Sequence, residues 1–224
     1  MMEMMEKKLA EAYLLGAYLG DGHCQVRTVR RPFNYQFMMP STDPDLLVKV
    51  RSCIHQCFPQ SADRVSIKKY HANDRAEHLF CGSKDLCLFL RSRCDVKNRL
   101  PLFPNVTLFR EFVAGLMDTD GWIAESILPY GSRWSIGFAT TSLWHDSFKR
   151  LLQHYGVKVG KTLIKNCDKN PNWKPLYSVT FNKDSFVDAG FYFSIQRKCE
   201  RLQNWQRYAY GEISETRSQG PAIS

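Results

Sequence analysis

A nine-residue segment occurs twice in this chain, and its repetition limits the folds open to the sequence. Leu14–Gly22 reads LLGAYLGDG and Val113–Gly121 reads VAGLMDTDG, so that Asp21 and Asp120 stand 99 positions apart. A period of this length is far longer than the roughly 20–50 residues of solenoid repeats. The sequence therefore predicts two copies of one domain.

The segments that follow the two motifs repeat in the same order: two strands, an amphipathic helix, two more strands and a closing helix. The predicted strands are 23–30, 34–40, 64–70 and 77–81 in the first half, and 122–128, 133–140, 161–166 and 176–181 in the second. The predicted middle helices are 45–58 and 143–155, with N-caps in Ser41–Asp43 and Thr141–Ser142, and the closing helices begin near Lys84 and Lys183. The sequence thus predicts an α+β fold of two αββαββα repeats, over 1–105 and 106–210, with a polar tail over 211–224.

Composition excludes several classes of protein. The chain has 224 residues and a net charge of +9, which is spread over both halves. Such an excess suits a broad surface for a polyanion such as nucleic acid. The longest apolar run, Phe112 to Met117, is far shorter than the roughly 20 residues of a membrane span, and the N-terminus lacks the features of a secretory signal. We expect an intracellular protein whose eight cysteines act as small buried hydrophobes.

The motifs themselves predict two helices in close contact. Gly16 and Gly20 lie four residues apart on one face of the first helix, and Gly115 and Thr119 hold the same places in the second. Small residues at this spacing allow two helix backbones to approach closely. Glycine costs about 1 kcal/mol against alanine within a helix, and close packing supplies a reason for that cost. We predict that these four residues form the interface between the halves.

Each motif ends in Asp-Gly, where Gly22 and Gly121 suit the position after a helix end. Asp21 and Asp120 then stand at the negative ends of two helix dipoles, and parallel packing of the helices brings them together. Two such carboxylates are costly without a cation between them, and aspartate oxygens suit Mg²⁺. The pair therefore points to divalent metal and phosphodiester chemistry. Asp118, which has no acidic counterpart in the first motif, is expected on the helix surface or in a capping role.

Both motifs resemble those of the LAGLIDADG homing endonucleases, and the order of strands and helices resembles that family over nearly the whole chain. The second motif, with GLMDTDG, matches closely. The first departs from the family pattern at Leu19, where an aspartate is usual, but it keeps the aspartate of the metal-binding position. The resemblance implies catalytic, metal-binding carboxylates at Asp21 and Asp120, and a metal site that also includes Gly20 and Thr119.

The resemblance implies an architecture and a reaction as well. Two-motif members of the family act as monomers, and their two antiparallel four-stranded sheets form a saddle over double-stranded DNA with the motif helices packed at the centre. They cleave both strands across the minor groove and leave 3′ overhangs, with two or three Mg²⁺ ions between the paired carboxylates. A basic residue follows the last helix of each repeat. This implies catalytic roles for Lys97 and Lys198, with Arg197 as the rival of Lys198.

Polar side chains on the strands are the candidates for DNA contact, because alternation places every second side chain on the same face of a sheet. Arg and Lys suit guanine edges or phosphates, whereas Gln and Asn suit adenine. The candidates in the first half are Gln25, Arg27, Asn34, Gln36, Ser66 and Lys68, and those in the second are Ser126, Arg133, Ser135, Lys161, Lys165, Ser178 and Thr180. By contrast, Trp122, Trp134 and Trp173 are expected in the core or at its rim.

Two other functions remain open on this fold. A maturase would bind group I intron RNA and aid its splicing through the same basic surface, although intact Asp21 and Asp120 favour cleavage. A transcription regulator would need an added helix-turn-helix domain, for which 208–224 is too short and too polar. The target sequence is not readable from the chain, because base recognition depends on side-chain pose, water and DNA bending.

Overall fold

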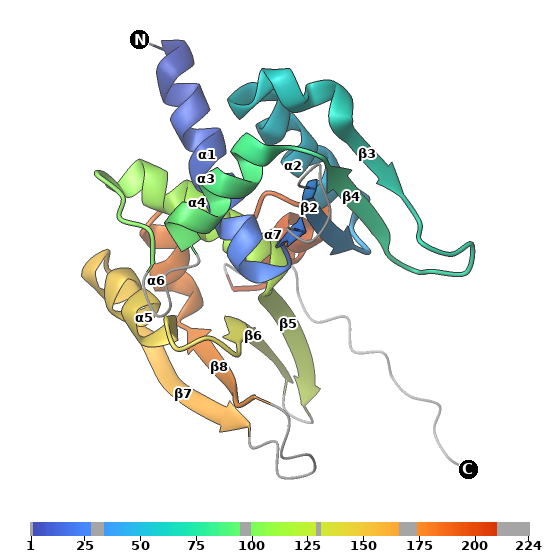
Figure 1. The fold of residues 1–224 in the computed structure, drawn as a ribbon. Helices are drawn as coiled ribbons and strands as arrows, with labels where there is room; N and C mark the ends of the chain where they lie inside the picture. The colour runs from blue at the N-terminus through green and yellow to red at the C-terminus, as the bar shows by residue number, and fades with distance from the viewer. Residues whose placement is uncertain (1, 28–33, 95–99, 129–130, 166–173, 210–224) are drawn as a thin grey trace, which may run out of the picture.

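The structure, a computed structural model, describes residues 2–27, 34–94, 100–128, 131–165 and 174–209, and its elements form two halves of similar plan (Figure 1). The first half contains α1 (Met2–Gly20), β1 (His23–Arg27), β2 (Asn34–Ser41), α2 (Pro44–Cys57), the short helix η1 (Pro59–Arg64), β3 (Val65–Lys68), β4 (Glu77–Cys81) and α3 (Lys84–Cys94). The second contains α4 (Val106–Thr119), β5 (Gly121–Leu128), β6 (Gly131–Thr140), α5 (His145–His154), β7 (Val159–Lys165), β8 (Leu176–Phe181), α6 (Lys183–Asp188) and α7 (Gln196–Ala209).

The predicted α+β fold of two αββαββα repeats is confirmed, and every predicted strand is present within a few residues of its expected bounds. The end of the second half departs from the plan, because two helices, α6 and α7, follow its last strand. Gly190 has φ of 77°, a left-handed conformation that an α-helix cannot continue through. The segment between the two helices then buries Phe191 and Phe193 before α7 begins.

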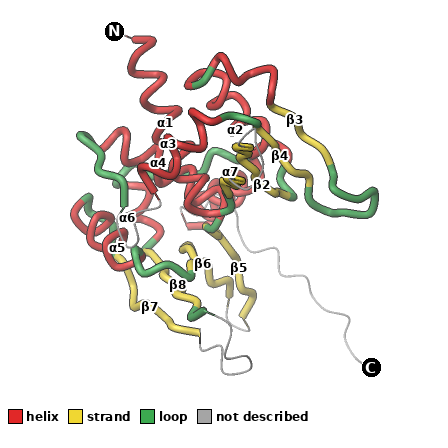
Figure 2. Tube along the Cα trace, in the orientation of Figure 1, coloured by secondary structure: helices red, strands yellow, loops and turns green. Residues whose placement is uncertain are grey.

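Each half builds one antiparallel four-stranded sheet, and the strand orders are β1-β2-β4-β3 and β5-β6-β8-β7. Helices pack on one face of each sheet, as the helices drawn in red beside the yellow strands show in Figure 2. Phe37 and Leu79 point to this covered face in the first half, and Phe138 and Val179 do so in the second; all four are fully buried. We term the opposite face of each sheet its open face.

The core differs in chemistry between the halves. Cysteine and aliphatic side chains are frequent in the first half, whereas stacked and edge-on rings such as Phe138, Phe148 and Phe181 fill the second. None of the seven cysteines within the described part of the chain forms a disulfide, and six of them are buried, as expected; Cys167 lies outside the described residues. None of the described helices combines the length and apolarity that a bilayer crossing requires.

The predicted N-cap position of the first middle helix is confirmed at Asp43, whereas that of the second is wrong. Asp43 does occupy the N-cap position of α2, but it makes no capping hydrogen bond there, because its carboxylate binds Arg197. Helix α5 begins later than predicted, after Trp144, so Thr141–Ser142 do not cap it. Instead the amide of Ser142 donates to the Thr140 hydroxyl, 3.2 Å away, in the turn before the helix.

The glycines that end the motifs serve a different purpose from the one predicted. The left-handed glycines of the described chain are Gly156 and Gly190, so neither Gly22 nor Gly121 adopts the usual backbone of a glycine after a helix end. Glycine is required at position 121 because a β-carbon there would stand only 2.4 Å from the carbonyl oxygen of Met117. The chain turns tightly from α4 into β5 at this point.

Candidate active site

The site is built on the contact between α1 and α4, the most extensive helix pairing in the molecule. A β-carbon at Gly16 would lie 2.0 Å from the carbonyl oxygen of Phe112, and one at Gly115 would lie 2.2 Å from that of Tyr13. Each glycine therefore admits the backbone of the opposite helix, in a reciprocal arrangement. The two motif helices pack at the centre of the fold, as predicted.

This packing brings the C-terminal ends of both motifs together. Asp120 is the C-cap residue of α4, and Asp21 follows directly after the end of α1. A β-carbon at Gly20 would stand 3.5 Å from the carboxyl carbon of Asp120 and would clash with the Thr119 hydroxyl. The Thr119 hydroxyl itself is turned inward and donates to the Leu116 carbonyl at 2.9 Å. The absence of a side chain at Gly20 thus makes room for the Thr119 side chain, and the Asp120 carboxyl group lies within ordinary contact distance of the first motif.

The electrostatics of the pair favour a cation. Burial, together with the charge of Asp21, raises the pKa of Asp120 to about 7, while Lys198 opposes the shift. Burial also raises the pKa of Asp21, which Lys198 again partly offsets. A bound divalent ion would lower both pKa values, because it replaces the missing solvation of the carboxylates.

The chemistry of the donors fits Mg²⁺ better than a softer metal. Two carboxylates on converging helix ends offer hard oxygen ligands, and Mg²⁺ commonly takes one or two protein carboxylates plus water and phosphate. The described residues contain no group of three or more His, Cys, Asp and Glu side chains that could enclose a metal. Asp21 and Asp120 would therefore hold the ion and leave much of its coordination to water or a phosphate.

The structure separates the two candidates for the second basic residue. Lys198 is buried beneath the second motif, and its ammonium donates to the carbonyls of Met117 and Asp118, both at 2.7 Å, and of Gly121 at 2.6 Å. Burial lowers the pKa of Lys198 to about 8, against the opposing charge of Asp118. Lys97, the predicted counterpart in the first half, lies outside the described residues.

Arg197 points away from the motif and pairs with the first half. Its guanidinium makes two hydrogen bonds to the carboxylate of Asp43, at 2.7 and 2.8 Å. This pairing holds the pKa of Asp43 below its usual range. Arg197 therefore joins α7 to the start of α2, whereas Lys198 is the neighbour of Asp120.

The expectation of a surface position for Asp118 is wrong. This residue is 1% exposed and accepts a hydrogen bond of 2.7 Å from the Tyr13 hydroxyl of the opposite motif helix. Its carboxylate also accepts from the hydroxyl of Ser194 and from the amides of Ser194 and Ile195, just before α7 begins. Asp118 thus anchors the start of α7, the helix that carries Lys198 back to α4.

In the second half, six of the seven predicted DNA-contacting residues lie on one face. Strand pairing sets Ser126 opposite Arg133, and the strand register places the others on the same side, away from Phe138. This open-face set is Ser126, Arg133, Ser135, Lys165, Ser178 and Thr180. Lys161 lies between Val159 and Thr162, where the pairing register of β7 shifts, so strand alternation does not assign it to a face. Most are exposed or half-buried, but Ser178 is only 8% exposed. Trp122, expected in the core or at its rim, is half-buried on the same open face, while Trp173 lies outside the described residues.

The first half shows the same arrangement. Gln25 stands opposite Gln36, and Ser66 stands opposite Phe80, so Gln25, Gln36, Ser66 and Lys68 share the open face. The backbone of Arg27 pairs with that of Asn34, but the side chains of these two candidates lie outside the described part of the structure. Ser66 and Lys68 are exposed, whereas Gln25 and Gln36 are half-buried. Sequence reasoning missed that Phe80, a nearly buried aromatic residue, belongs to this face as well, because strand alternation alone did not reveal which face of β4 is covered.

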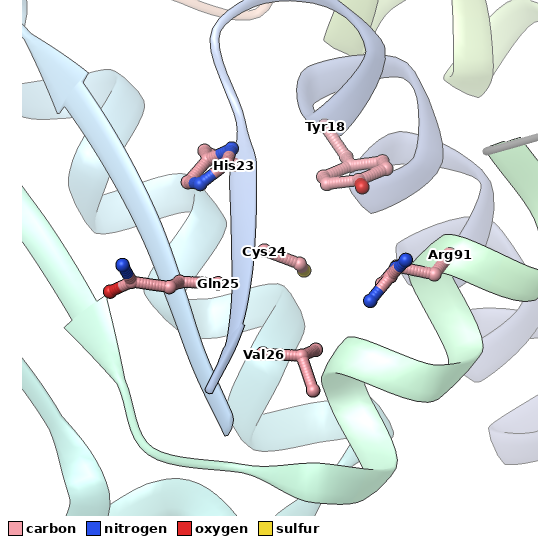
Figure 3. A pocket seen from close by; sticks show the side chains of 6 residues that line it. All are labelled: Tyr18, His23, Cys24, Gln25, Val26 and Arg91. Carbon is pink, nitrogen blue, oxygen red and sulfur yellow. The ribbon is translucent and has the colours of Figure 1, made fainter. Parts of the chain in front are cut away.

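A pocket of about 420 Å³ lies beside β1 (Figure 3). Strand β1 supplies His23, Cys24, Gln25 and Val26, α1 supplies Tyr18, and Arg91 reaches in from α3. The figure shows the guanidinium of Arg91 directed toward the strand, across from the Tyr18 ring. Asp21 stands two residues before β1 in the chain but is not among the residues that line this pocket.

Comparison with known proteins shows the fold. No protein-family model and no curated protein sequence matches the chain. The crystal structure of I-DmoI in complex with DNA and Mn is similar, with a TM-score of 0.60 and 16% identity over 81% of this chain and 94% of that one. The LAGLIDADG meganuclease I-AabMI bound to uncleaved DNA is similar with a TM-score of 0.57 and 10% identity, over 89% and 90% of the two chains.

A third similar structure is the meganuclease I-SmaMI bound to DNA, with a TM-score of 0.55, 14% identity and coverage of 91% of both chains. The protein therefore has the fold of the LAGLIDADG meganucleases, and the resemblance seen in the two motifs is confirmed at the level of architecture. I-DmoI itself is described as a homing endonuclease.

Proposed function

We propose that this protein is a site-specific homing endonuclease that cleaves both strands of a DNA duplex. The observation that carries the proposal is the pair of aspartates, Asp21 and Asp120, at the ends of two abutting helices, each beside an open sheet face with polar and basic side chains. Similar structures contain DNA, with Mn or Ca in two cases, which supports duplex DNA as the partner ahead of intron RNA.

The chain's own residues have distinct parts in the proposed reaction. Asp21 and Asp120 would hold two or three Mg²⁺ ions, which supply activation of water and stabilisation of the leaving oxygen when bound. Lys198, whose protons are directed at backbone carbonyls around the end of α4, would hold that end in place and offset the negative charge of the carboxylates. A single chain supplies both carboxylates, so we propose that a monomer cuts both strands and leaves 3′ overhangs.

The proposal is tested first by finding the target. Incubation of a partly random duplex library with the protein and Mg²⁺, followed by sequencing of the cut ends, should yield one extended recognition sequence with staggered 3′ ends. On that duplex, Asp21→Asn and Asp120→Asn should each reduce the cleavage rate by at least roughly 100-fold while binding is retained, because each removes a metal ligand.

Asp63→Asn is the matched control, because it removes one carboxylate charge at an exposed position of η1 far from the motifs. It should leave cleavage unchanged. Full activity in both motif variants, or loss of activity in the control alone, would contradict the assignment of the site.

A further inference from the structure

The open face of the first sheet carries a compact group of aromatic and sulfur-containing side chains, Met38, Tyr70, His78 and Phe80, which we term the aromatic patch. The rings of Tyr70 and Phe80 meet edge-on with centroids 5.4 Å apart, and Tyr70 and His78 meet edge-on at 4.6 Å. The Tyr70 hydroxyl points to the sulfur of Met38 at 3.8 Å. Tyr70 thus ties β4 to β2 across the surface of the sheet.

Among the described residues, the second sheet carries other side chains at the equivalent positions, and 166–173, which follow β7, lie outside them. Strand register sets Met38 opposite Phe80 in the first sheet, and Gly137 opposite Thr180 in the second. The position of His78 corresponds by the same register to Ser178. The second open face has apolar side chains of its own, because the half-buried Trp122 ring lies beside Gly137, and Leu163, opposite Ser178, is 59% exposed. The cluster of Met38, His78 and Phe80 is therefore a feature of the first sheet.

The aromatic patch is accessible and lies in a positively charged setting. Tyr70 is 55% exposed, whereas Phe80 is only 7% exposed beneath it. The ammonium of Lys68 stands 5.1 Å from the centre of the Phe80 ring, so a cation borders the apolar surface directly. Phe80 therefore supports the patch from below, and Tyr70 and Met38 form its contact surface.

The chemistry of the patch selects one feature of DNA. Lys68 can pair with the phosphates of a DNA backbone, while the rings of the patch contact an apolar group in the groove. In the major groove, the C5-methyl group of thymine is the apolar feature that aromatic and aliphatic side chains contact.

We propose that the aromatic patch is a specificity determinant that reads thymine methyl groups in one half of the target. This inference rests on the proposed function, and it assigns thymine recognition by these side chains to the half-site over the first sheet.

The test replaces single thymines by deoxyuridine in the selected target duplex, which removes the methyl group and leaves the pairing intact. Binding is measured by competition with the full chain, without added divalent metal. In one half-site, replacing a thymine that contacts the patch should lower the affinity of the protein for the duplex about fourfold, the effect expected when one methyl group is no longer buried. Any effect of replacements in the other half-site should be the same in the wild type and in variants of the patch.

Two variants connect that effect to the patch. Tyr70→Ser changes an exposed side chain, and Phe80→Thr installs the residue found at the equivalent position of the second sheet. Both should bind the deoxyuridine and thymine duplexes equally. Val48→Ala, a change at an exposed apolar position of α2, outside the open face, is the control and should keep the wild-type preference for thymine.

The outcomes separate the two proposals. If the duplex is bound and cut but deoxyuridine has no effect at any position, thymine recognition is wrong and the endonuclease assignment stands. If the effect persists at full size in Tyr70→Ser and in Phe80→Thr, the aromatic patch does not read the methyl group. If no duplex sequence is selected or cut, the proposed function itself fails, and the inference fails with it.

Discussion

At the scale of single residues, the second motif carboxylate is the group most strongly shaped by its surroundings. Asp120 is held at a helix end, where the dipole already disfavours negative charge, and next to Asp21. Its pKa of about 7 means that the folded protein binds a proton there more tightly than the unfolded chain does. The free energy of unfolding should therefore fall as pH rises from about 4 to about 7 in the absence of metal.

Asp120→Asn removes this dependence. The variant should be more stable than the wild type above pH 7, by about 1–3 kcal/mol, and should lose the advantage near pH 4, where the wild-type carboxyl is protonated. Urea unfolding in the presence of a chelator at several pH values measures the difference, with Asp63→Asn as the matched control. If the free energy of unfolding changed with pH in the same way in the wild type and in Asp120→Asn, folding would not raise the pKa of Asp120.

At the scale of elements, the packing of α1 against α4 determines where both carboxylates stand. Gly115 admits the backbone of Tyr13 so closely that a methyl group has no room. With alanine at position 115, the two helices must separate or the end of α4 must shift. Either movement would increase the distance between the two carboxylates of the metal site. Because alanine is intrinsically favoured by about 1 kcal/mol within a helix, any net loss of stability in such a variant must come from this contact.

Gly115→Ala should therefore destabilise the protein by about 2–3 kcal/mol, the usual cost of forcing an extra group into a well-packed core, and it should slow cleavage as well. Gly82→Ala is the matched control, because a β-carbon there would meet no atom within 4 Å. Denaturant unfolding and the cleavage rate measure the two effects. Equal stability of both variants would mean that the helices are not in tight contact.

At the scale of the whole molecule, the halves are joined by polar contacts as well as by the helix interface. In the buried connection, the hydroxyls of Tyr13 and Ser194 both donate to the carboxylate of Asp118. A more exposed connection pairs Asp43 with Arg197, whose side chain is about half exposed, and the Gln196 amide donates to the Asp45 carboxylate at 2.6 Å beside it. Removing a buried hydrogen bond costs roughly 1–3 kcal/mol, whereas an exposed ion pair contributes roughly 0–1 kcal/mol.

We therefore expect Tyr13→Phe to lower the free energy of unfolding by about 1–2 kcal/mol and Arg197→Gln to lower it by less than about 1 kcal/mol. The contribution of the Asp43 pair should be present near neutral pH and lost as pH falls through the lowered pKa of Asp43. Calorimetry at pH 7 and below pH 4 measures both. A larger loss from Arg197→Gln than from Tyr13→Phe would reverse the ranking of the two connections.

The sequence by itself determined the duplicated plan, the order of strands and helices, and the pair Asp21 and Asp120, because local periodicity and a repeated motif encode them. It also predicted which candidate DNA-contacting residues of a strand share a face, because side chains alternate between the two faces along each strand. Only the tertiary structure decided which lysine or arginine adjoins Asp120, where Asp118 lies, and which aromatic residues meet on the first sheet. Those features join positions from about 10 to more than 100 residues apart, and no local pattern records which distant side chain will fill a given space.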